Sequence, residues 1–211
     1  MSALHFGPAG NVPAGYARVM AGTVLLRGHS PDKAPNWFSP AVDAAGRGRF
    51  DLPVRFHDDP GVCYLAPKLE GVLLERVIRD VVRSPMSRRT LAREHAITQV
   101  RLTRDLMCFE LLSAAWTAHG VQMSVLTALP PYEATQGLAR KLVSTTGLLP
   151  NGDPLVADGI AYGSRFGAAH ECLAIWDRAA DALTWGATRP LGDDPQELTR
   201  ACEQLGIELI D

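Results

Sequence analysis

Short runs of β-branched and aliphatic residues, separated by loops, constrain the fold of this chain more than any other feature. Three such runs are Thr23–Leu26, Gly61–Ala66 and Ile160–Ser164, and their length and composition predict short strands. The first is expected to stop at Arg27 and to enter a loop. Regular crossover helices between the strands are few, which is not typical of a doubly wound parallel sheet. The sequence therefore predicts an α+β fold class.

Further strands are predicted where apolar residues gather or alternate between turn signals. Ile97–Leu102 and Leu106–Leu112 flank Thr103-Arg104-Asp105 and are predicted as a strand pair or a turn. Glu171–Asp177 alternates well enough to be the neighbour of the strand that begins at Ile160.

Helices are predicted in three places. Tyr132–Thr145 follows two prolines, which cannot lie in a helix interior, and Pro195–Leu205 precedes Gly206, a typical helix-ending residue. In Lys68–Val82 the apolar residues recur at spacings of three and four, with Glu75 on the flank of the stripe. These apolar residues are Leu69, Val72, Leu73, Val77 and Val81.

Composition and charge exclude several classes of function. The 211 residues contain 46% hydrophobic and 21% charged residues without a linker or repeat, which predicts a single domain over residues 1–211. A net charge of −2 and a pI near 6.3 give no field that attracts nucleic acid or an anionic membrane. Residues 1–10 lack the pattern of a signal peptide, and no apolar run has the ~18 residues of a membrane helix. We expect a cytoplasmic protein that binds neither nucleic acid nor membrane.

Cysteine and histidine spacing predicts no metal site. The six histidines are dispersed and show no HExxH or similar spacing. The four cysteines lie far apart without a CxxC pair and are expected to be reduced core residues. They are Cys63, Cys108, Cys172 and Cys202.

Taken singly, the polar residues that could carry chemistry also have structural explanations. Arg27 at a strand end can be explained as a solvated surface charge. Glu75 can be explained as an exposed carboxylate that pairs with Arg79 four residues later. Tyr64 suits the core, and Ser164 suits the cap of a strand. The sequence has no Walker loop, no GxGxxG motif after a strand and no nucleophile elbow.

Five blocks of residues, between Arg27 and about Arg178, change this interpretation by their order and spacing. They are Arg27-Gly28-His29 with Pro35-Asn36-Trp37-Phe38 and Pro40; Gly48-Arg49-Phe50-Asp51 with Pro53; Tyr64-Leu65-Ala66 with Glu75; Pro131-Tyr132-Glu133 with Thr135-Gln136; and Asp158-Gly159-Ile160 with Tyr162, Ser164 and Arg165. Together these blocks resemble the RES-domain family, named for arginine, glutamate and serine. Many relatives have an aromatic residue directly after the first arginine, where this chain has Gly28. Ring stacking is therefore expected to depend on Tyr64 and on Trp37 or Phe38.

The resemblance implies a fold similar to that of ADP-ribosyltransferases, with split mixed β-sheets flanked by helices. It implies an enzyme that consumes NAD as a substrate and needs no cofactor, and that acts as the toxin of a toxin–antitoxin pair. The expected partner is a helical antitoxin with an Xre-like domain, held in a hetero-oligomer. Carried over residue by residue, the resemblance implies that one cleft is faced by Arg27, Arg49, Tyr64, Glu75 and Ser164, with His29 at its rim or in a structural role.

These residue types suit cleavage of the bond between nicotinamide and ribose. Arginine forks bind phosphate oxygens, which gives Arg27 and Arg49 a task at the pyrophosphate of NAD. Tyr64 offers a ring face to the cationic nicotinamide. Glu75 would stabilise an oxocarbenium-like ribose, as carboxylates do in glycosidases, and Ser164 would orient the ribose or the carboxamide. We predict catalytic roles for Glu75, Arg27 and Ser164, and substrate-binding roles for Arg49, Tyr64 and His29.

The acceptor of the ADP-ribosyl group stays open at this stage. With water as acceptor the chain would be a NAD glycohydrolase, and with inorganic phosphate as co-substrate it would be a NAD phosphorylase. These two activities are favoured because no segment is obviously dedicated to docking a protein substrate. A protein side chain would make it an ADP-ribosyltransferase. The alternative of another class is a nucleotide-binding module without catalysis, for which Gly28 is the only indication.

Overall fold

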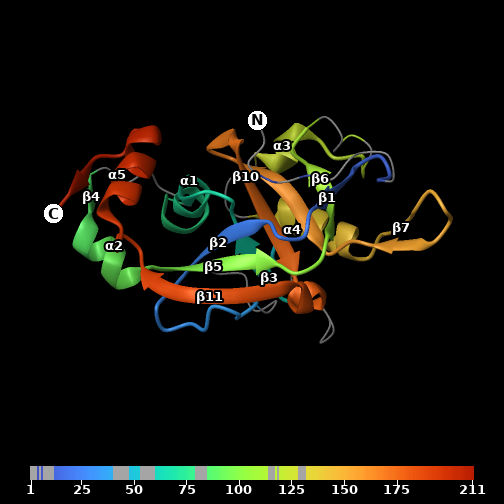
Figure 1. Ribbon diagram of the computed structural model, residues 1–211. Helices are drawn as coiled ribbons and strands as arrows, with labels where there is room; N and C mark the ends of the chain where they lie inside the picture. Colours follow the sequence, from blue (N-terminus) through green and yellow to red (C-terminus); the bar gives the residue numbers. More distant parts are fainter. Residues whose placement is uncertain are drawn as a thin grey trace.

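Two β-sheets form the centre of the fold (Figure 1). The computed structural model describes residues 4, 6, 12–39, 48–52, 60–78, 85–113, 117, 119–127 and 132–211. The larger sheet has five strands in the order β1-β6-β9-β10-β3, in which β6 and β9 are parallel and the other pairs antiparallel. Its strands are β1 (Tyr16–Val19), β3 (Val62–Leu65), β6 (Leu106–Leu111), β9 (Gly159–Ser164) and β10 (Gly167–Trp176).

The second sheet is antiparallel, with the strand order β11-β5-β2. Its strands are β2 (Val24–His29), β5 (Ala96–Leu102) and β11 (Leu183–Pro190). It meets the larger sheet where Leu26 and Ala66 exchange two backbone hydrogen bonds, with N···O distances of 2.7 and 2.9 Å. Two small ribbons complete the strands, β4 (Met86–Ser87) with β12 (Leu209–Ile210) and β7 (Thr146–Leu148) with β8 (Pro154–Val156).

The helices lie around the larger sheet and at one end of the molecule (Figure 1). They are α1 (Leu69–Val72), which continues as a π-helix (Leu73–Ile78), then α2 (Arg88–Glu94), α3 (Met123–Leu126), α4 (Glu133–Val143), a 3₁₀ helix (Asp177–Ala182) and α5 (Pro195–Gln204). Split mixed sheets with flanking helices confirm the predicted α+β fold class.

The core has two layers that follow from the alternation of side chains along the strands. Cys63 and Leu65 of β3 pack with Leu25 and Val100 of the second sheet, which fills the space between the sheets. Residues of the opposite face, such as Trp176, pack with the helices. All four cysteines are buried and free, as expected from the sequence.

Strand β2 is longer than the sequence predicted. The prediction stopped it at Arg27, but pairing with β5 continues to His29, which lies opposite Ala96. Arg27 and His29 are both buried, with about 5% of each residue exposed. Backbone and hydroxyl oxygens bind their polar atoms, so these residues remain in the sheet despite their polarity.

Two other expectations are corrected. The strands on either side of Thr103-Arg104-Asp105 do not pair, because β5 belongs to the second sheet and β6 to the larger one. Arg104, which lies between β5 and β6, binds Asp158, the residue directly before β9 of the larger sheet, with N···O distances of 3.0 and 3.2 Å. The helix predicted at Lys68–Val82 begins at Leu69 and becomes a π-helix at Leu73; its last four predicted residues, 79–82, lie outside the described part.

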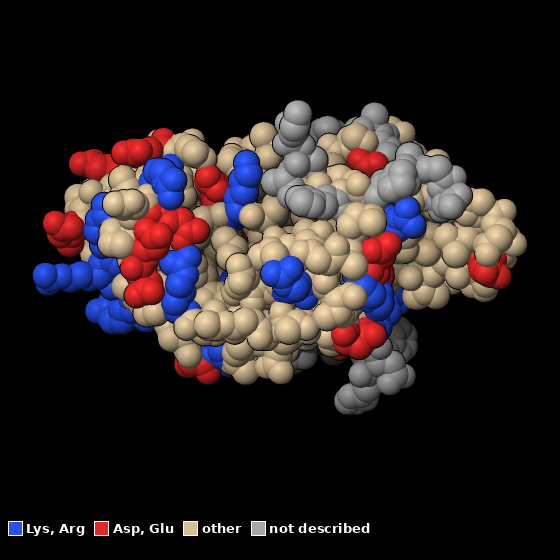
Figure 2. All heavy atoms as spheres, viewed as in Figure 1, with Lys and Arg blue, Asp and Glu red and all other residues tan. Residues whose placement is uncertain are grey.

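Charged residues of both signs gather at the end of the molecule that carries α2 and α5, whereas the surface over β5 and β11 carries few charges (Figure 2). On this face no extended patch has a single sign, which fits the small net charge of the chain. Within the described part, no helix combines the length and apolar character needed to cross a membrane.

Candidate functional site

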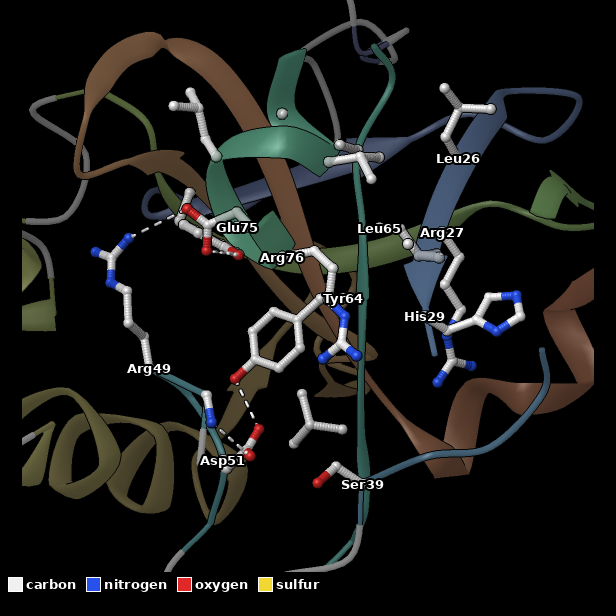
Figure 3. Close-up of a pocket in the computed structure, with 18 of the residues that line it drawn as sticks. Leu26, Arg27, His29, Ser39, Arg49, Asp51, Tyr64, Leu65, Glu75 and Arg76 are labelled. Carbon is white, nitrogen blue, oxygen red and sulfur yellow. Dashed lines mark hydrogen bonds and ion pairs between the residues drawn. The ribbon is translucent and has the colours of Figure 1, made fainter. Parts of the chain in front are cut away.

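A cavity of about 300 Å³ lies where the two sheets meet the π-helix. Its wall is built by β2 and the segment after it, the turn at residues 48–51, β3, the π-helix and the end of β9. Five of the six predicted site residues line it: Arg27, His29, Arg49, Tyr64 and Glu75 (Figure 3). Ser164 does not line it. That serine is buried at the end of β9, where its Oγ accepts a hydrogen bond from the backbone N–H of Phe166 at 3.4 Å.

Glu75 projects from the π-helix toward the cavity. The Tyr162 hydroxyl donates to its Oε2 at 3.0 Å, and Arg49 Nη1 lies 3.9 Å from its Oε1. The Glu75 side chain is 14% exposed, so one face of the carboxylate is held by protein and the rest is open to a ligand. Single π-helical turns of this kind are frequent at functional sites.

Arg49 is fixed from several sides. Its Nη2 donates to the carbonyl of Leu126, and its Nη1 lies 3.5 Å from the carbonyl of Gly163. The guanidinium lies over the rings of Phe50 and Tyr162, 5.2 and 5.3 Å from their centroids. Its buried Nε has no hydrogen-bond partner within the described residues. The arginine is therefore preorganised beside Glu75 before any ligand binds.

Tyr64 and Asp51 form a second polar unit in the wall. The Tyr64 hydroxyl donates to Asp51 Oδ1 at 2.7 Å and accepts from the N–H of Phe50 at 2.9 Å. Burial and the neighbouring Asp51 charge raise the pKa of Tyr64 well above its usual value, so the phenol stays a neutral donor. Gly48 lies against its ring, and a Cβ there would be 2.4 Å from the hydroxyl oxygen.

Arg27 and His29 occupy the side of the cavity formed by the second sheet (Figure 3). The Arg27 Nη atoms donate to the carbonyls of Pro35 and Trp37, and its guanidinium lies 5.5 Å from the centroid of Trp185. Burial, which disfavours the charged form, lowers the pKa of Arg27.

His29 is held in one tautomer. Its Nδ1 is 2.9 Å from the carbonyl of Ser30, which can only accept, so Nδ1 carries the proton. Nε2 then accepts from the hydroxyl of Thr98 at 2.9 Å. Burial, and next the charges of Arg27 and Arg76, lower the pKa of His29 and favour this neutral form.

Sequence reasoning missed several side chains of the cavity. Arg76 follows Glu75 on the π-helix and donates through Nη2 to the hydroxyl of Ser30. Arg165 lies over the rings of Tyr132 and Phe166, 5.6 and 4.7 Å from their centroids. The charged and aromatic residues missed are Lys33, Asp51, Arg76, Tyr132, Tyr162, Arg165 and Phe166. All but Lys33, Arg76 and Phe166 were part of the five blocks, so membership of a block was the available signal.

The lining carries more positive than negative charge. Its cations are Lys33 and the arginines Arg27, Arg49, Arg76 and Arg165, against the two carboxylates Asp51 and Glu75. A concave site with this balance attracts an anionic ligand, and planar arginine forks favour phosphate oxygens. Among the described residues, no cluster of His, Cys, Asp and Glu could hold a metal ion.

Gly28 is explained by packing. A Cβ at this position would lie 2.6 Å from Val72 Cγ1 and 3.3 Å from Arg76 Cβ. The helix that carries Glu75 therefore approaches β2 too closely to leave room for a side chain. An aromatic residue at position 28 would require this helix to move.

Comparisons with known proteins found a matching family model and a similar solved structure. The family model of the RES domain matches residues 24–197, a span that contains all six predicted site residues. A similar solved chain occurs in the crystal structure of the M. tuberculosis MbcT–MbcA toxin–antitoxin complex. The two chains are 13% identical with a TM-score of 0.54, over 87% of this chain and 91% of that one. At this identity the similarity shows a shared fold. No curated protein matches the sequence significantly.

Proposed function

Because the chain belongs to the RES domain family, we propose that it is an enzyme that cleaves the bond between nicotinamide and ribose in NAD. One observation carries the proposal: the Glu75 carboxylate is held at the wall of a cavity whose charge balance is positive. A carboxylate can stabilise a ribosyl cation, and the surrounding cations suit a pyrophosphate.

The chemistry needs a fixed negative charge more than a general acid. When the C1′–N bond breaks, its electron pair returns to the pyridinium nitrogen, and nicotinamide leaves as a neutral molecule. Positive charge develops on the ribose, where Glu75 would offset it. Burial raises the pKa of Tyr162, so its hydroxyl remains protonated and keeps donating to Glu75.

The remaining wall residues would bind and orient the dinucleotide. Arg49 and Arg76 would bind the pyrophosphate, and the Tyr64 ring would pack against nicotinamide. Ser164 would act through its own turn, since its hydroxyl accepts from the Phe166 N–H beside Arg165. His29, neutral and hydrogen-bonded on both nitrogens, would have a supporting role.

The acceptor that completes the reaction would be water or inorganic phosphate. Water forms a new C1′–O bond and gives up one proton to solvent, yielding ADP-ribose. Inorganic phosphate forms the same bond through one of its oxygens and yields ADP-ribose with a phosphate on the C1′ atom that carried nicotinamide. The cationic lining suits an anionic acceptor as well as the substrate.

The cellular role that we propose is that of a toxin controlled by an antitoxin. The MbcT–MbcA structure is described as a toxin–antitoxin complex, and the shared fold supports the same arrangement here. The partner would be a helical, Xre-like antitoxin in a cytoplasmic hetero-oligomer. Expression of the chain alone should stop growth, and Glu75→Gln should remove this effect.

Nicotinamide release from NAD by the purified protein tests the reaction, with and without inorganic phosphate. Glu75→Gln keeps the size of the side chain and loses its charge, so we expect release to fall by about a hundredfold or more. Glu70→Gln, on α1 and outside the cavity lining, is the matched control and should behave as wild type. Wild-type protein that releases no nicotinamide in either buffer, while still binding NAD, would leave a binding module.

A further inference from the structure

The segment Ser30–Ser39, here called the wall segment, forms the cavity wall next to β2. Its C-terminal end joins β3 through reciprocal backbone hydrogen bonds between Ser39 and Val62, with N···O distances of 2.9 and 3.0 Å. Its N-terminal end is held at Ser30, whose hydroxyl accepts from Arg76 and whose carbonyl accepts from His29. Between these ends the Arg27 guanidinium binds the carbonyls of Pro35 and Trp37. Side chains from two elements therefore hold the segment in place.

Trp37 is the feature of the wall segment that the folded chain alone does not explain. It lines the cavity, yet it is 41% exposed. Lys33 Nζ lies 5.3 Å from the centroid of its ring. An indole presented to a cavity beside a cation is suited to stack on a base and to attract a nearby phosphate.

The order of side chains across the cavity matches the order of groups in a dinucleotide. In Figure 3, Glu75 and Arg49 lie on one side, the Arg76 guanidinium is central, and Arg27 and His29 lie on the other side. Trp37 belongs to the latter side, because its carbonyl binds Arg27. It therefore lies away from Glu75, and the stacking on nicotinamide that the sequence also offered to Trp37 is assigned to Tyr64 alone. A NAD molecule with its scissile bond at Glu75 and its pyrophosphate at Arg76 would place its adenosine half at the wall segment.

We propose that the wall segment is the adenosine subsite of the cavity, that Trp37 stacks on adenine, and that Arg27 is the positioning residue that holds this subsite. The inference rests on the proposed cleavage of NAD and adds how the far half of the substrate is recognised. In this assignment Arg27 does not touch the reacting atoms, and the positioning role replaces the catalytic and pyrophosphate-binding roles predicted for it from the sequence.

The chemistry of arginine fits a positioning role. Its planar fork can bind two carbonyls at once, while a lysine ammonium is a single point charge that cannot reproduce this geometry. The Trp185 ring supports the guanidinium from β11. Among the described residues no carboxylate forms an ion pair with Arg27; its terminal nitrogens bind only backbone carbonyls.

Two substrates separate the halves of the site: NAD, and nicotinamide mononucleotide, which has the scissile bond but no adenosine. We expect Trp37→Ala to raise the KM for NAD about tenfold, as for the loss of a base–aromatic stack, and to leave kcat/KM for the mononucleotide within about twofold of wild type. Leu148→Ala, which removes an exposed apolar side chain outside the cavity, is the control and should change neither.

Arg27→Lys should show the same selective loss, with faster hydrogen exchange of the Lys33 and Trp37 amides, which close turns within the wall segment. An equal loss with both substrates would mean that Arg27 acts at the nicotinamide half, and would overturn its assignment. Unchanged kinetics of Trp37→Ala with NAD would overturn the subsite. If Arg27→Lys does not fold, Trp37→Ala still decides, because its side chain is exposed.

Binding of AMP separates this inference from the proposed reaction. If wild-type protein cleaves neither substrate, the proposed reaction fails, but a calorimetric titration with AMP still tests the subsite. AMP binding that Trp37→Ala weakens about tenfold supports the inference. No binding of AMP to wild-type protein overturns it.

Discussion

The two sides of the cavity hold their buried arginines in different ways. On the side of the larger sheet, Arg49 lies 3.9 Å from the Glu75 carboxylate and over two aromatic rings. On the side of the second sheet, Arg27 has no carboxylate partner among the described residues and binds the carbonyls of Pro35 and Trp37. One cation thus accompanies the anion proposed to act on substrate, and the other supports backbone.

This difference predicts different consequences when each side is changed. Removing the cation beside the Glu75 carboxylate leaves a half-buried negative charge without its ion-pair partner. Removing a cation bound to carbonyls leaves neutral dipoles that water can reach when the segment loosens. Substitutions on the Arg49 side should therefore cost both stability and activity, and substitutions on the Arg27 side should affect mainly the binding of one half of the ligand.

Arg49→Met should have the largest effect. It keeps much of the side-chain volume and removes the charge next to Glu75 and the donor to Leu126, so we expect the free energy of unfolding to fall by about 3 kcal/mol. Nicotinamide release should fall at least about a hundredfold. Urea denaturation and the release assay measure the two. Arg101→Met, at an exposed site on β5, is the control; equal stability of the two variants would contradict the comparison.

Gly28→Ala tests the contact between the two sides, where the helix bearing Glu75 crosses β2. The added Cβ would lie 2.6 Å from Val72 Cγ1, so we expect a loss of about 2 kcal/mol in the free energy of unfolding. The loss should shrink in a Val72→Ala background, which removes the clashing methyl group. Gly137→Ala in α4, where a Cβ has open space, should be neutral or stabilising. A loss unaffected by Val72→Ala would place the strain elsewhere.

Tyr64→Phe removes one hydroxyl from the Arg49 side. Asp51 Oδ1 loses the hydrogen bond from Tyr64, and the Phe50 N–H loses the Tyr64 oxygen as acceptor. We therefore expect the free energy of unfolding to fall by about 1–2 kcal/mol, less than for Arg49→Met. Tyr16→Phe is the matched control, because the Tyr16 hydroxyl makes no hydrogen bond to any described residue. Thermal unfolding of both variants measures the difference, and similar midpoints would show that the Tyr64–Asp51 bond is worth little.

The sequence predicted those parts of the fold that depend on local pattern. The strand at Gly61–Ala66 was visible as a short continuous run of apolar residues. The helix beginning at Tyr132 was visible because it follows two prolines, which cannot lie in a helix interior. The extension of β2 to His29 was not visible, because its polar residues are satisfied by partners distant in sequence, such as Thr98. The passage of the chain from one sheet to the other at Arg104 was missed for the same reason, since Arg104 binds Asp158, which is distant in sequence.

The candidate site was predictable in its members more than in their contacts. The order of the blocks predicted that Arg49 and Glu75 share one cavity. It did not predict the hydrogen bond between Tyr162 and Glu75, which depends on the π-helix and on the position of β9. Ser164 shows the reverse case. Its block was found, but its short side chain binds its own turn and does not reach the cavity lining.

His29→Gln should have the smallest effect on the free energy of unfolding, and the pH dependence of this free energy tests the Arg27 side separately. Burial lowers the pKa of His29 in the folded protein, while in the unfolded chain it titrates near its usual value of about 6.5. Below that pH the unfolded state binds more protons, so the free energy of unfolding falls as the pH decreases through the folded pKa. Denaturation at pH 7.5 and pH 5 should show a flatter pH dependence for His29→Gln, with a cost of about 1 kcal/mol at the higher pH. His95, whose pKa burial also lowers, should retain its share of the slope. An unchanged slope would mean that the Arg27 side accommodates a protonated His29 without losing its hydrogen bonds.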